Sequence, residues 1–215
     1  MNCSACGNKT AKLNVGESPI SGYTCNTIDE SLLQPSFEMN LFICSDCSMV
    51  QYQWFDDAEN VLDRLYSGHF ATYYFTEVMS EYMNSFVDVL CDKYNLTQNS
   101  SILEIGCNSG RMLHMFKEKI NCQVLGVEPS TTFNSEWQGM NINVINDYFG
   151  EPVAKKINDQ HFDLIYFRHV YEHIPSPISF FQQVTSLASD DTIIVIEVPY
   201  LMDVINYKRI ENISY

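Results

Sequence analysis

The chain has 215 residues, 46% of them hydrophobic, which is enough for one large domain or for a medium domain with a small appendage. It carries 12 Lys and Arg against 27 Asp and Glu, a formal net charge of −15. A surface this acidic repels phosphate backbones and argues against nucleic acid as a partner. The sequence shows neither an 18-residue apolar run nor a signal-peptide pattern, so we expect no membrane span and a cytoplasmic location.

Residues 1–55 are predicted to form a zinc-binding module. Two Cys-x-x-Cys pairs, Cys3 with Cys6 and Cys44 with Cys47, are separated by 37 residues that we expect to fold as a small hairpin or loop. In a chain without a secretion signal, such pairs favour metal binding over disulfides. Four thiolates suit tetrahedral Zn²⁺ and leave no open position, so the metal would be structural. The alternative is a set of redox-active or merely buried cysteines.

Residues 56–98 are predicted to be an aromatic linker followed by a helical lid. The aromatic stretch 66–75 either packs between modules or covers a ligand, in which case the Tyr66 hydroxyl would point inward. Residues 76–94 show helical spacing, with Thr76 as a plausible N-cap. The apolar positions that we expect to pack on the main sheet are Val78, Met79, Tyr82, Met83, Phe86, Val87 and Leu90.

Residues 99–215 alternate between strand and helix patterns. Apolar strand patterns cover 102–105, 123–128, 142–145, 162–167 and 192–198, and helical patterns lie near 110–119, 131–138, 151–157 and 177–188. This alternation predicts an α/β fold, a Rossmann-like doubly wound and mainly parallel sheet with helices on both faces. Such sheets usually continue beyond a fifth strand, so we expect this core to be truncated at its C-terminus.

A glycine loop follows the first of these strands, with the spacing Gly106-x-x-x-Gly110. A strand, a glycine turn and a helix are expected to offer free backbone N–H groups and a surface without Cβ atoms to a nucleoside-bearing cofactor. Glu128 ends the second strand, where its carboxylate can accept hydrogen bonds from both hydroxyls of a ribose and disfavours the extra phosphate of NADP. The alternative for Glu128 is a solvated charge, and NAD stays open on these features alone.

Three segments resemble the motifs of class I S-adenosylmethionine methyltransferases: residues 102–110, 125–130 and 169–177. The resemblance implies a set of cofactor contacts. Glu104, Gly106, Asn108 and Gly110 would surround the methionine part, and Glu128 would bind the ribose. Asp147 and Tyr148 would lie near the adenine, and Arg168 and His169 would border the sulfonium end.

The cysteine pairs, the aromatic stretch and Val198-Pro-Tyr-Leu201 together look like the zinc-containing nucleotide-sugar C-methyltransferases. This resemblance implies a small-molecule substrate, a nucleotide-linked 4-keto-deoxysugar, methylated at carbon through an enolate. It also implies His173 as the base and Tyr66 as a substrate-facing hydroxyl, with Glu211 matching a proton-transfer segment. The same Glu-His-Ile-Pro segment occurs in other methyltransferases, where the histidine is only structural.

The chain departs from that family at two positions of the proton-transfer segment. Arg209 stands where the family has tyrosine, and Asn212 where it has a second histidine. The family's C-terminal domain is also not in this sequence. Alternatives are therefore O- or N-methylation of another small molecule, or a non-catalytic binding module with this fold. A dehydrogenase is disfavoured by the loop spacing.

Overall fold

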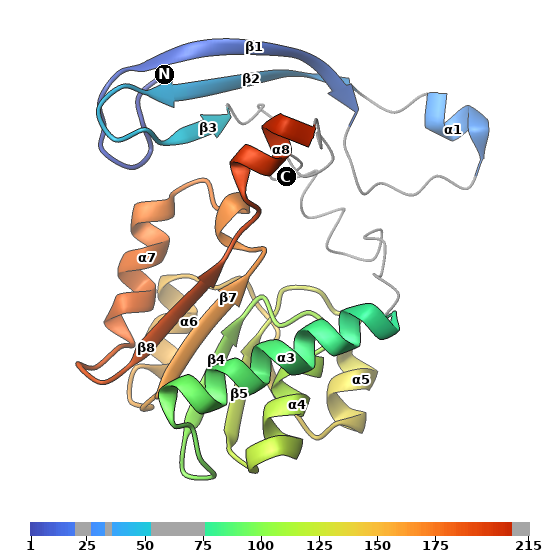
Figure 1. Cartoon of the computed structure of the whole chain (residues 1–215), viewed down its shortest axis with the longest axis vertical. Coiled ribbons are helices and arrows are strands. Elements are labelled where there is room, and N and C mark those ends of the chain that lie inside the picture. Colours follow the sequence, from blue (N-terminus) through green and yellow to red (C-terminus); the bar gives the residue numbers. More distant parts are fainter. Residues whose placement is uncertain (20–26, 33–35, 53–75, 208–215) are drawn as a thin grey trace. The chain divides into compact units, whose positions relative to one another are not determined.

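The computed structural model describes residues 1–19, 27–32, 36–52 and 76–207, which divide between two compact units (Figure 1). The first unit comprises Met1–Ala71, Glu172–Ser179 and Pro199–Tyr215, and the second comprises Thr72–Tyr171 and Phe180–Val198. Within the described residues no helix combines the length and apolar character needed to cross a membrane.

The first unit contains an antiparallel sheet with the strand order β1-β2-β3. Its strands are β1 (Thr10–Pro19), β2 (Ser36–Cys44) and β3 (Val50–Tyr52). Thr10 pairs with Cys44, and Ile43 pairs with Val50. This register brings the turn before β1 beside the turn between β2 and β3, so the two cysteine pairs meet at one end of the sheet. The unit also holds the helices α1 (Ile28–Leu32) and α8 (Leu201–Tyr207) and the 3-10 turn η2 (Tyr171–His173), which begins at the boundary of the two units.

The second unit is built on a five-stranded parallel sheet with the order β6-β5-β4-β7-β8. The strands are β4 (Ser101–Ile105), β5 (Gln123–Val127), β6 (Asn143–Ile145), β7 (Leu164–Arg168) and β8 (Ile193–Glu197). The chain first winds outward from β4 to β6 and then crosses back to β7. The predicted doubly wound α/β fold is thereby confirmed, and the carboxyl ends of β4 and β7 flank the point at which the winding reverses, where such sheets bind ligands.

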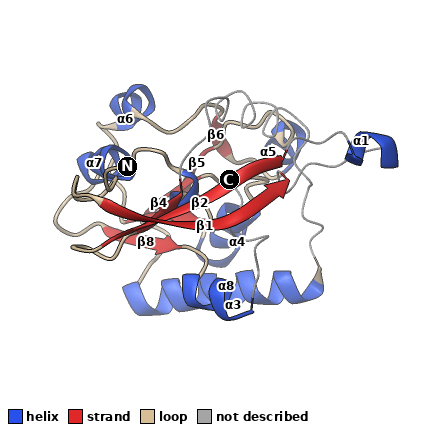
Figure 2. Ribbon diagram, turned by 90° about the horizontal axis from the view of Figure 1, so that it is seen from above, coloured by secondary structure: helices blue, strands red, loops and turns tan. Residues whose placement is uncertain are grey.

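Helices cover both faces of this sheet (Figures 1 and 2). They are α3 (Glu77–Tyr94), α4 (Arg111–Ile120), α5 (Asn134–Gly139), α6 (Glu151–Ile157) and α7 (Pro177–Ser186). Successive strand residues point to opposite faces: Leu164 and Tyr166 join the core beneath α3 and α4, whereas Phe167 contacts Phe180 of α7.

Helix α3 begins as predicted, because the Thr76 side chain accepts a hydrogen bond from the backbone N–H of Met79 at 3.2 Å. Its later turns bury Met83, Val87 and Leu90. The expectation that Val78, Met79 and Tyr82 also pack on the sheet is wrong, since their exposures are 74%, 41% and 45%. The buried side of the helix therefore starts one turn later than its apolar pattern.

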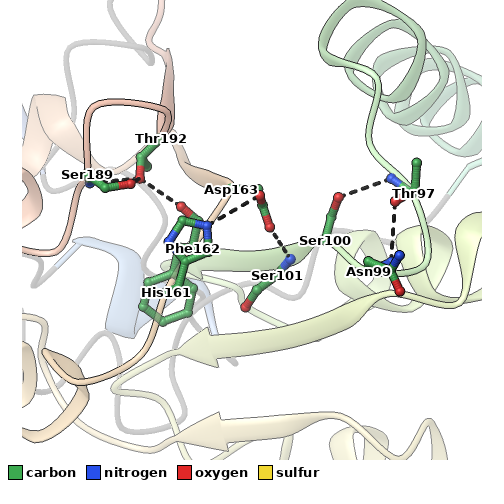
Figure 3. Close-up of polar contacts among 9 residues, drawn as sticks. All are labelled: Thr97, Asn99, Ser100, Ser101, His161, Phe162, Asp163, Ser189 and Thr192. Atoms are coloured by element: carbon green, nitrogen blue, oxygen red, sulfur yellow. Dashed lines mark hydrogen bonds and ion pairs between the residues drawn. The ribbon is translucent and has the colours of Figure 1, made fainter.

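The amino edge of the sheet is joined by side chains, drawn in Figure 3. Asp163 Oδ2 accepts a hydrogen bond from the backbone N–H of Ser101 at 2.7 Å, and Asp163 Oδ1 lies 3.4 Å from His161 Nε2. The hydroxyl of Thr192 donates to the carbonyl of Phe162 at 2.8 Å. These contacts align the starts of β4, β7 and β8, so that their carboxyl ends present a fixed edge to a ligand.

Candidate functional site

The glycine loop between β4 and α4 adopts a backbone that requires glycine. Gly106 and Gly110 have φ of +75° and +74°, a region that side-chain-bearing residues rarely adopt. A Cβ on Gly106 would also collide with the side chain of Val170. The loop therefore lies against the segment that follows β7, and its surface is narrow and close to the backbone.

The N–H groups of this loop are already used within the protein. Those of Gly106 and Cys107 donate to the carbonyl of Val127 at 2.8 and 3.2 Å, and that of Gly110 donates to the carbonyl of Cys107 at 2.8 Å. The N–H of Asn108 donates to Glu128 Oε2 at 2.8 Å, and that of Ser109 to Asn108 Oδ1 at 2.7 Å. The expectation of free N–H groups here is therefore wrong. Because these backbone N–H groups already donate to acceptors within the protein, the loop has none left to bind a pyrophosphate.

Glu104 lies in β4, just before the loop, and is 5% exposed. Its Oε2 has no hydrogen-bond partner among the described residues. Burial raises the pKa of Glu104 to about 8, and the neighbouring Tyr166 hydroxyl and the charge of Arg168 lower it only in part. A buried carboxyl group with an unused oxygen suits a ligand that brings a positive charge or a hydrogen-bond donor.

Glu128 follows β5 and is also buried. Its two carboxylate oxygens accept hydrogen bonds from the N–H groups of Asn108 and Ser130, at 2.8 and 2.9 Å. Burial raises the pKa of Glu128, while these two N–H groups oppose that shift. Each carboxylate oxygen can accept a further hydrogen bond, so Glu128 can hold the loop and still receive hydroxyl donors.

Asn146 is a residue of this site that the sequence did not single out. Its Nδ2 lies 2.7 to 3.1 Å from the carbonyl oxygens of Glu128, Pro129 and Ser130. The amide group thus fixes the backbone that carries the Glu128 carboxylate. No motif marks it, because its role depends on the pairing of β5 with β6.

Asp147 and Tyr148 follow directly after Asn146, beyond the end of β6. Asp147 Oδ1 accepts a hydrogen bond from the Tyr148 N–H at 2.8 Å, and the Tyr148 side chain is 49% exposed. An exposed aromatic ring beside a carboxylate is suited to contact a base. These two residues, Glu128 and the loop all lie at the carboxyl edge of the sheet.

Arg168 ends β7 and is held by several partners. Its Nε and Nη2 donate to the two carboxylate oxygens of Glu197 at 2.7 and 3.2 Å. The guanidinium carbon lies 5.3 and 4.9 Å from the ring centroids of Tyr82 and Phe86 in α3. His169 Nε2 lies 3.2 Å from Glu197 Oε1. No sequence motif marks Glu197, which becomes the partner of Arg168 through the β7–β8 register.

Of the three catalytic candidates, only His173 lies within the described residues. His173 ends the 3-10 turn η2 and belongs to the first unit, whereas Glu104, Glu128 and His169 belong to the second. Tyr66 and Glu211 lie outside the described residues. Their roles stay predictions.

The cysteines of the two pairs converge in the first unit. The Sγ atoms of Cys3 and Cys47 are 3.5 Å apart, as are those of Cys6 and Cys44, and all four lie within 4.8 Å of one another. Zn–S bonds of about 2.3 Å in a tetrahedron place the sulfurs about 3.8 Å apart. The four thiol groups therefore already have nearly the spacing that a zinc ion requires.

The two Cys-x-x-Cys turns have the same backbone structure. The N–H of Gly7 donates to the Cys3 carbonyl at 2.9 Å, and that of Ser48 donates to the Cys44 carbonyl at 3.0 Å. Both residues have positive φ, of 77° and 59°. Hydrogen bonds from the N–H groups of Cys6 and Ala5 lower the pKa of Cys3 to about 7 despite partial desolvation, whereas contacts with the neighbouring thiol groups raise the pKa of Cys6 and of Cys47.

Gln51 joins these turns and was not singled out in the sequence. Its Oε1 accepts hydrogen bonds from the backbone N–H and the hydroxyl of Ser4, at 2.8 and 3.1 Å. Gln51 sits in β3, so this contact ties the first turn to the strand that follows the second.

Comparison with known proteins gives the chain a family. The family model described as a methyltransferase domain matches residues 75–215. The C-methyltransferase NovU of Streptomyces niveus is 23% identical over 220 residues, which cover 99% of this chain and 50% of NovU. The chain thus spans about half the length of this curated relative.

Solved structures with a similar fold include two methyltransferases. One, a SAM-dependent methyltransferase from Archaeoglobus fulgidus, is 22% identical, with 67% of each chain covered and a TM-score of 0.49. The other, from Thiobacillus denitrificans in complex with S-adenosyl-L-homocysteine, is 14% identical, with 69% of this chain and 61% of that one covered and a TM-score of 0.46. Because the family model matches well over half of its residues, the chain belongs to the methyltransferase domain family.

Proposed function

We propose that this chain is a methyltransferase that binds S-adenosylmethionine at the carboxyl edge of the parallel sheet. Glu104 would receive the ammonium group of the methionine part, and Gly106, Asn108 and Gly110 would line it. Glu128 would accept the ribose hydroxyls, with Asp147 and Tyr148 beside the adenine, and Arg168 and His169 would border the methyl-donor end. When bound, this cofactor supplies an electrophilic methyl group on a positively charged sulfur.

One observation carries the choice of this cofactor over a dinucleotide. All five N–H groups from Gly106 to Gly110 donate within the protein, while two carboxyl groups, Glu104 and Glu128, are buried beside the loop. A loop whose own N–H groups are all engaged, next to two acidic groups, disfavours a pyrophosphate and attracts a cationic ligand that carries hydroxyls. The orphan Oε2 of Glu104 and the surface without a Cβ at Gly106 fit such a ligand.

For the methyl acceptor we propose a nucleotide-linked keto-deoxysugar, methylated at the carbon beside the ketone. The support is the similarity to a protein named as a C-methyltransferase, which extends over 99% of this chain and so includes the cysteine pairs. Carbon methylation requires a base for the α-proton and donors for the enolate oxygen. The sequence candidates for these tasks are His173, Tyr66 and Glu211.

A second acceptor class is favoured by one feature of the sequence. Arg209 and Asn212 replace the tyrosine and histidine of the proton-transfer segment that this resemblance would require. A hydroxyl or amine on another small molecule needs less help with proton removal than a carbon does. O- or N-methylation on the same scaffold is therefore the alternative.

The function is tested by incubating the chain with methyl-labelled S-adenosylmethionine and thymidine diphosphate 4-keto-6-deoxyglucose. We expect a product heavier by one methylene, with the label on the carbon next to the ketone by NMR. Label on an oxygen would support the alternative. Binding of the cofactor product without transfer to any keto-sugar, hydroxyl or amine acceptor would contradict an enzymatic role and favour a binding module.

We also propose that Cys3, Cys6, Cys44 and Cys47 hold one structural Zn²⁺. The spacing of their sulfurs and the matching turns support this, and four thiolates leave no position for a substrate. Metal analysis of the purified chain should give one zinc per chain, lost in Cys44→Ser and retained in Cys122→Ser, which changes a cysteine of the second unit. A parent chain without zinc, or a Cys44→Ser variant that keeps it, would contradict the proposal.

A further inference from the structure

Two buried oxygen atoms lie on facing residues of the parallel sheet. Glu104 of β4 pairs directly with Tyr166 of β7, so both side chains leave the sheet on the same face. Glu104 Oε2 and the Tyr166 hydroxyl are both buried, and neither has a hydrogen-bond partner among the described residues. Because buried polar groups are nearly always hydrogen-bonded, two exceptions on paired residues indicate a site whose hydrogen bonds form when a ligand binds.

Tyr166 cannot turn its hydroxyl toward solvent. Its side chain is fully buried in the core beneath α3 and α4, and its ring centroid lies 5.8 Å from that of Phe116. Burial raises the pKa of the hydroxyl, and the charge of Glu104 adds to this effect more than that of any other group. Glu104 is therefore the electrostatic neighbour that Tyr166 has within this core. The side chains that α4 buries against the same core are apolar: Met112, Leu113 and Phe116.

Arg168, two residues further along β7, directs its donors away from Glu104. Its Nε and Nη2 donate to the carboxylate of Glu197 at 2.7 and 3.2 Å, and its Nη1 lies 2.6 Å from Met112 Sδ. Burial raises the pKa of Glu104, and the Tyr166 hydroxyl opposes this rise more strongly than the charge of Arg168 does. Tyr166 is thus the protein group that most favours the carboxylate form of Glu104.

We infer that Tyr166 is a positioning residue of the cofactor site, whose hydroxyl donates a hydrogen bond to Glu104 once the ammonium group of the cofactor has displaced the carboxyl proton to solvent. This inference rests on the proposed function. Glu104 gives up its proton because an adjacent positive charge favours the carboxylate. Tyr166 keeps its own proton, since the pKa of its hydroxyl is raised. The carboxylate then has the ammonium group as one partner and the hydroxyl as the other.

The first test compares stability with affinity in Tyr166→Phe. The hydroxyl has no partner in the part of the chain that the structure describes, so its removal should leave the urea midpoint of unfolding equal to or above that of the parent. The affinity for S-adenosylhomocysteine at pH 7 should nevertheless fall about 10-fold, as expected for the loss of a hydrogen bond to a charged group. A lower urea midpoint would overturn the inference, because the hydroxyl would then serve the fold itself.

Two controls accompany this test. Tyr94→Phe removes a hydroxyl from the last residue of α3, whose ring packs on the same core, and should bind S-adenosylhomocysteine as the parent does. Methylthioadenosine lacks the ammonium group, so it should bind equally well to the parent and to Tyr166→Phe. A 10-fold loss for this ligand as well would overturn the inference, because the hydroxyl would not act through the ammonium group.

The pH dependence separates a positioning role from a structural one. Only the carboxylate attracts the ammonium group, so the affinity rises with pH until the pH exceeds the pKa of Glu104. Loss of the Tyr166 hydroxyl raises that pKa, so the 10-fold deficit at pH 7 should shrink to within about 3-fold at about pH 9. An equal deficit at both pH values would overturn the inference. The other charged or titratable groups around Glu104 and Arg168 are unchanged in this variant: Glu128, Cys107, Glu197 and Tyr82.

The ionisation of Glu104 can also be measured without a ligand. With ¹³C-labelled glutamate, and the signal assigned by its loss in Glu104→Gln, the carboxyl carbon should titrate at about pH 8 in the parent. It should titrate at higher pH in Tyr166→Phe and at the parental pH in Tyr94→Phe. Equal titration in the parent and Tyr166→Phe would overturn the inference. A parent that binds no S-adenosylhomocysteine would contradict the proposed function, while this titration would still decide whether Tyr166 acts on Glu104.

Discussion

The carboxyl group of Glu104 is buried at the end of β4, and burial raises its pKa to about 8. At pH 7 it is mostly protonated in the free chain. A ligand that carries an ammonium group favours the carboxylate and lowers this pKa, so that binding must release a proton. The same carboxyl group would disfavour binding of a negatively charged ligand, because its carboxylate form repels negative charge.

We predict that binding of S-adenosylhomocysteine at pH 7 releases a proton and that the affinity rises between about pH 6 and pH 8. The check is calorimetry in two buffers of different ionisation enthalpy, in which the observed heats should differ. Glu104→Gln should abolish the difference, whereas Glu118→Gln, on the exposed side of α4, should keep it. Equal heats in both buffers for the parent would show that Glu104 does not meet the ligand's charge.

Gly106 is the position of the loop at which a side chain is least tolerated. We expect Gly106→Ala to lower the free energy of unfolding by about 1–3 kcal/mol, because it combines a positive φ with a collision with Val170. Gly139→Ala, whose Cβ would have no neighbour within 4 Å, should change the free energy of unfolding by less than about 0.5 kcal/mol.

Urea unfolding of both variants measures this difference. Adding Val170→Ala to Gly106→Ala should recover the part of the loss due to the collision and leave the part due to φ. Equal stability of Gly106→Ala and Gly139→Ala would mean that the loop does not have the backbone described.

At the scale of elements, the strands and helices of the second unit were predictable because each strand is a mainly apolar run between turn signals. The residues that join the elements were not. Glu197, Asn146 and Gln51 act through partners that are distant in sequence, and these partners are set by strand register. The exposure of Val78 likewise follows from where α3 meets the sheet, which its own pattern does not contain.

Asp163 shows how a strand start is fixed by one side chain (Figure 3). Asp163→Ala should lower the free energy of unfolding by about 1–2 kcal/mol, because the Ser101 N–H loses its acceptor. His161→Gln, which removes only the exposed ion pair with Asp163, should cost less than about 1 kcal/mol. Chemical denaturation of the two variants measures how far each lowers the free energy of unfolding. Equal decreases would contradict the role given to the Ser101–Asp163 hydrogen bond.

For the whole molecule, the sequence predicted both the cysteine cluster and the cofactor edge, because each is marked by a short motif. The sequence alone did not identify the residue that removes the proton from the substrate. His173 belongs to the first unit, and Tyr66 and Glu211 lie outside the described residues.

The central claim is that the carboxyl edge of the second unit binds S-adenosylmethionine rather than a dinucleotide. Calorimetric titration of the full chain with S-adenosylhomocysteine, with NAD as the control, tests it most directly. We predict saturable binding of the first at one site and none of the second, with Glu128→Ala weakening binding by about 1–3 kcal/mol. Binding of NAD without S-adenosylhomocysteine, or an affinity unchanged in Glu128→Ala, would contradict the account.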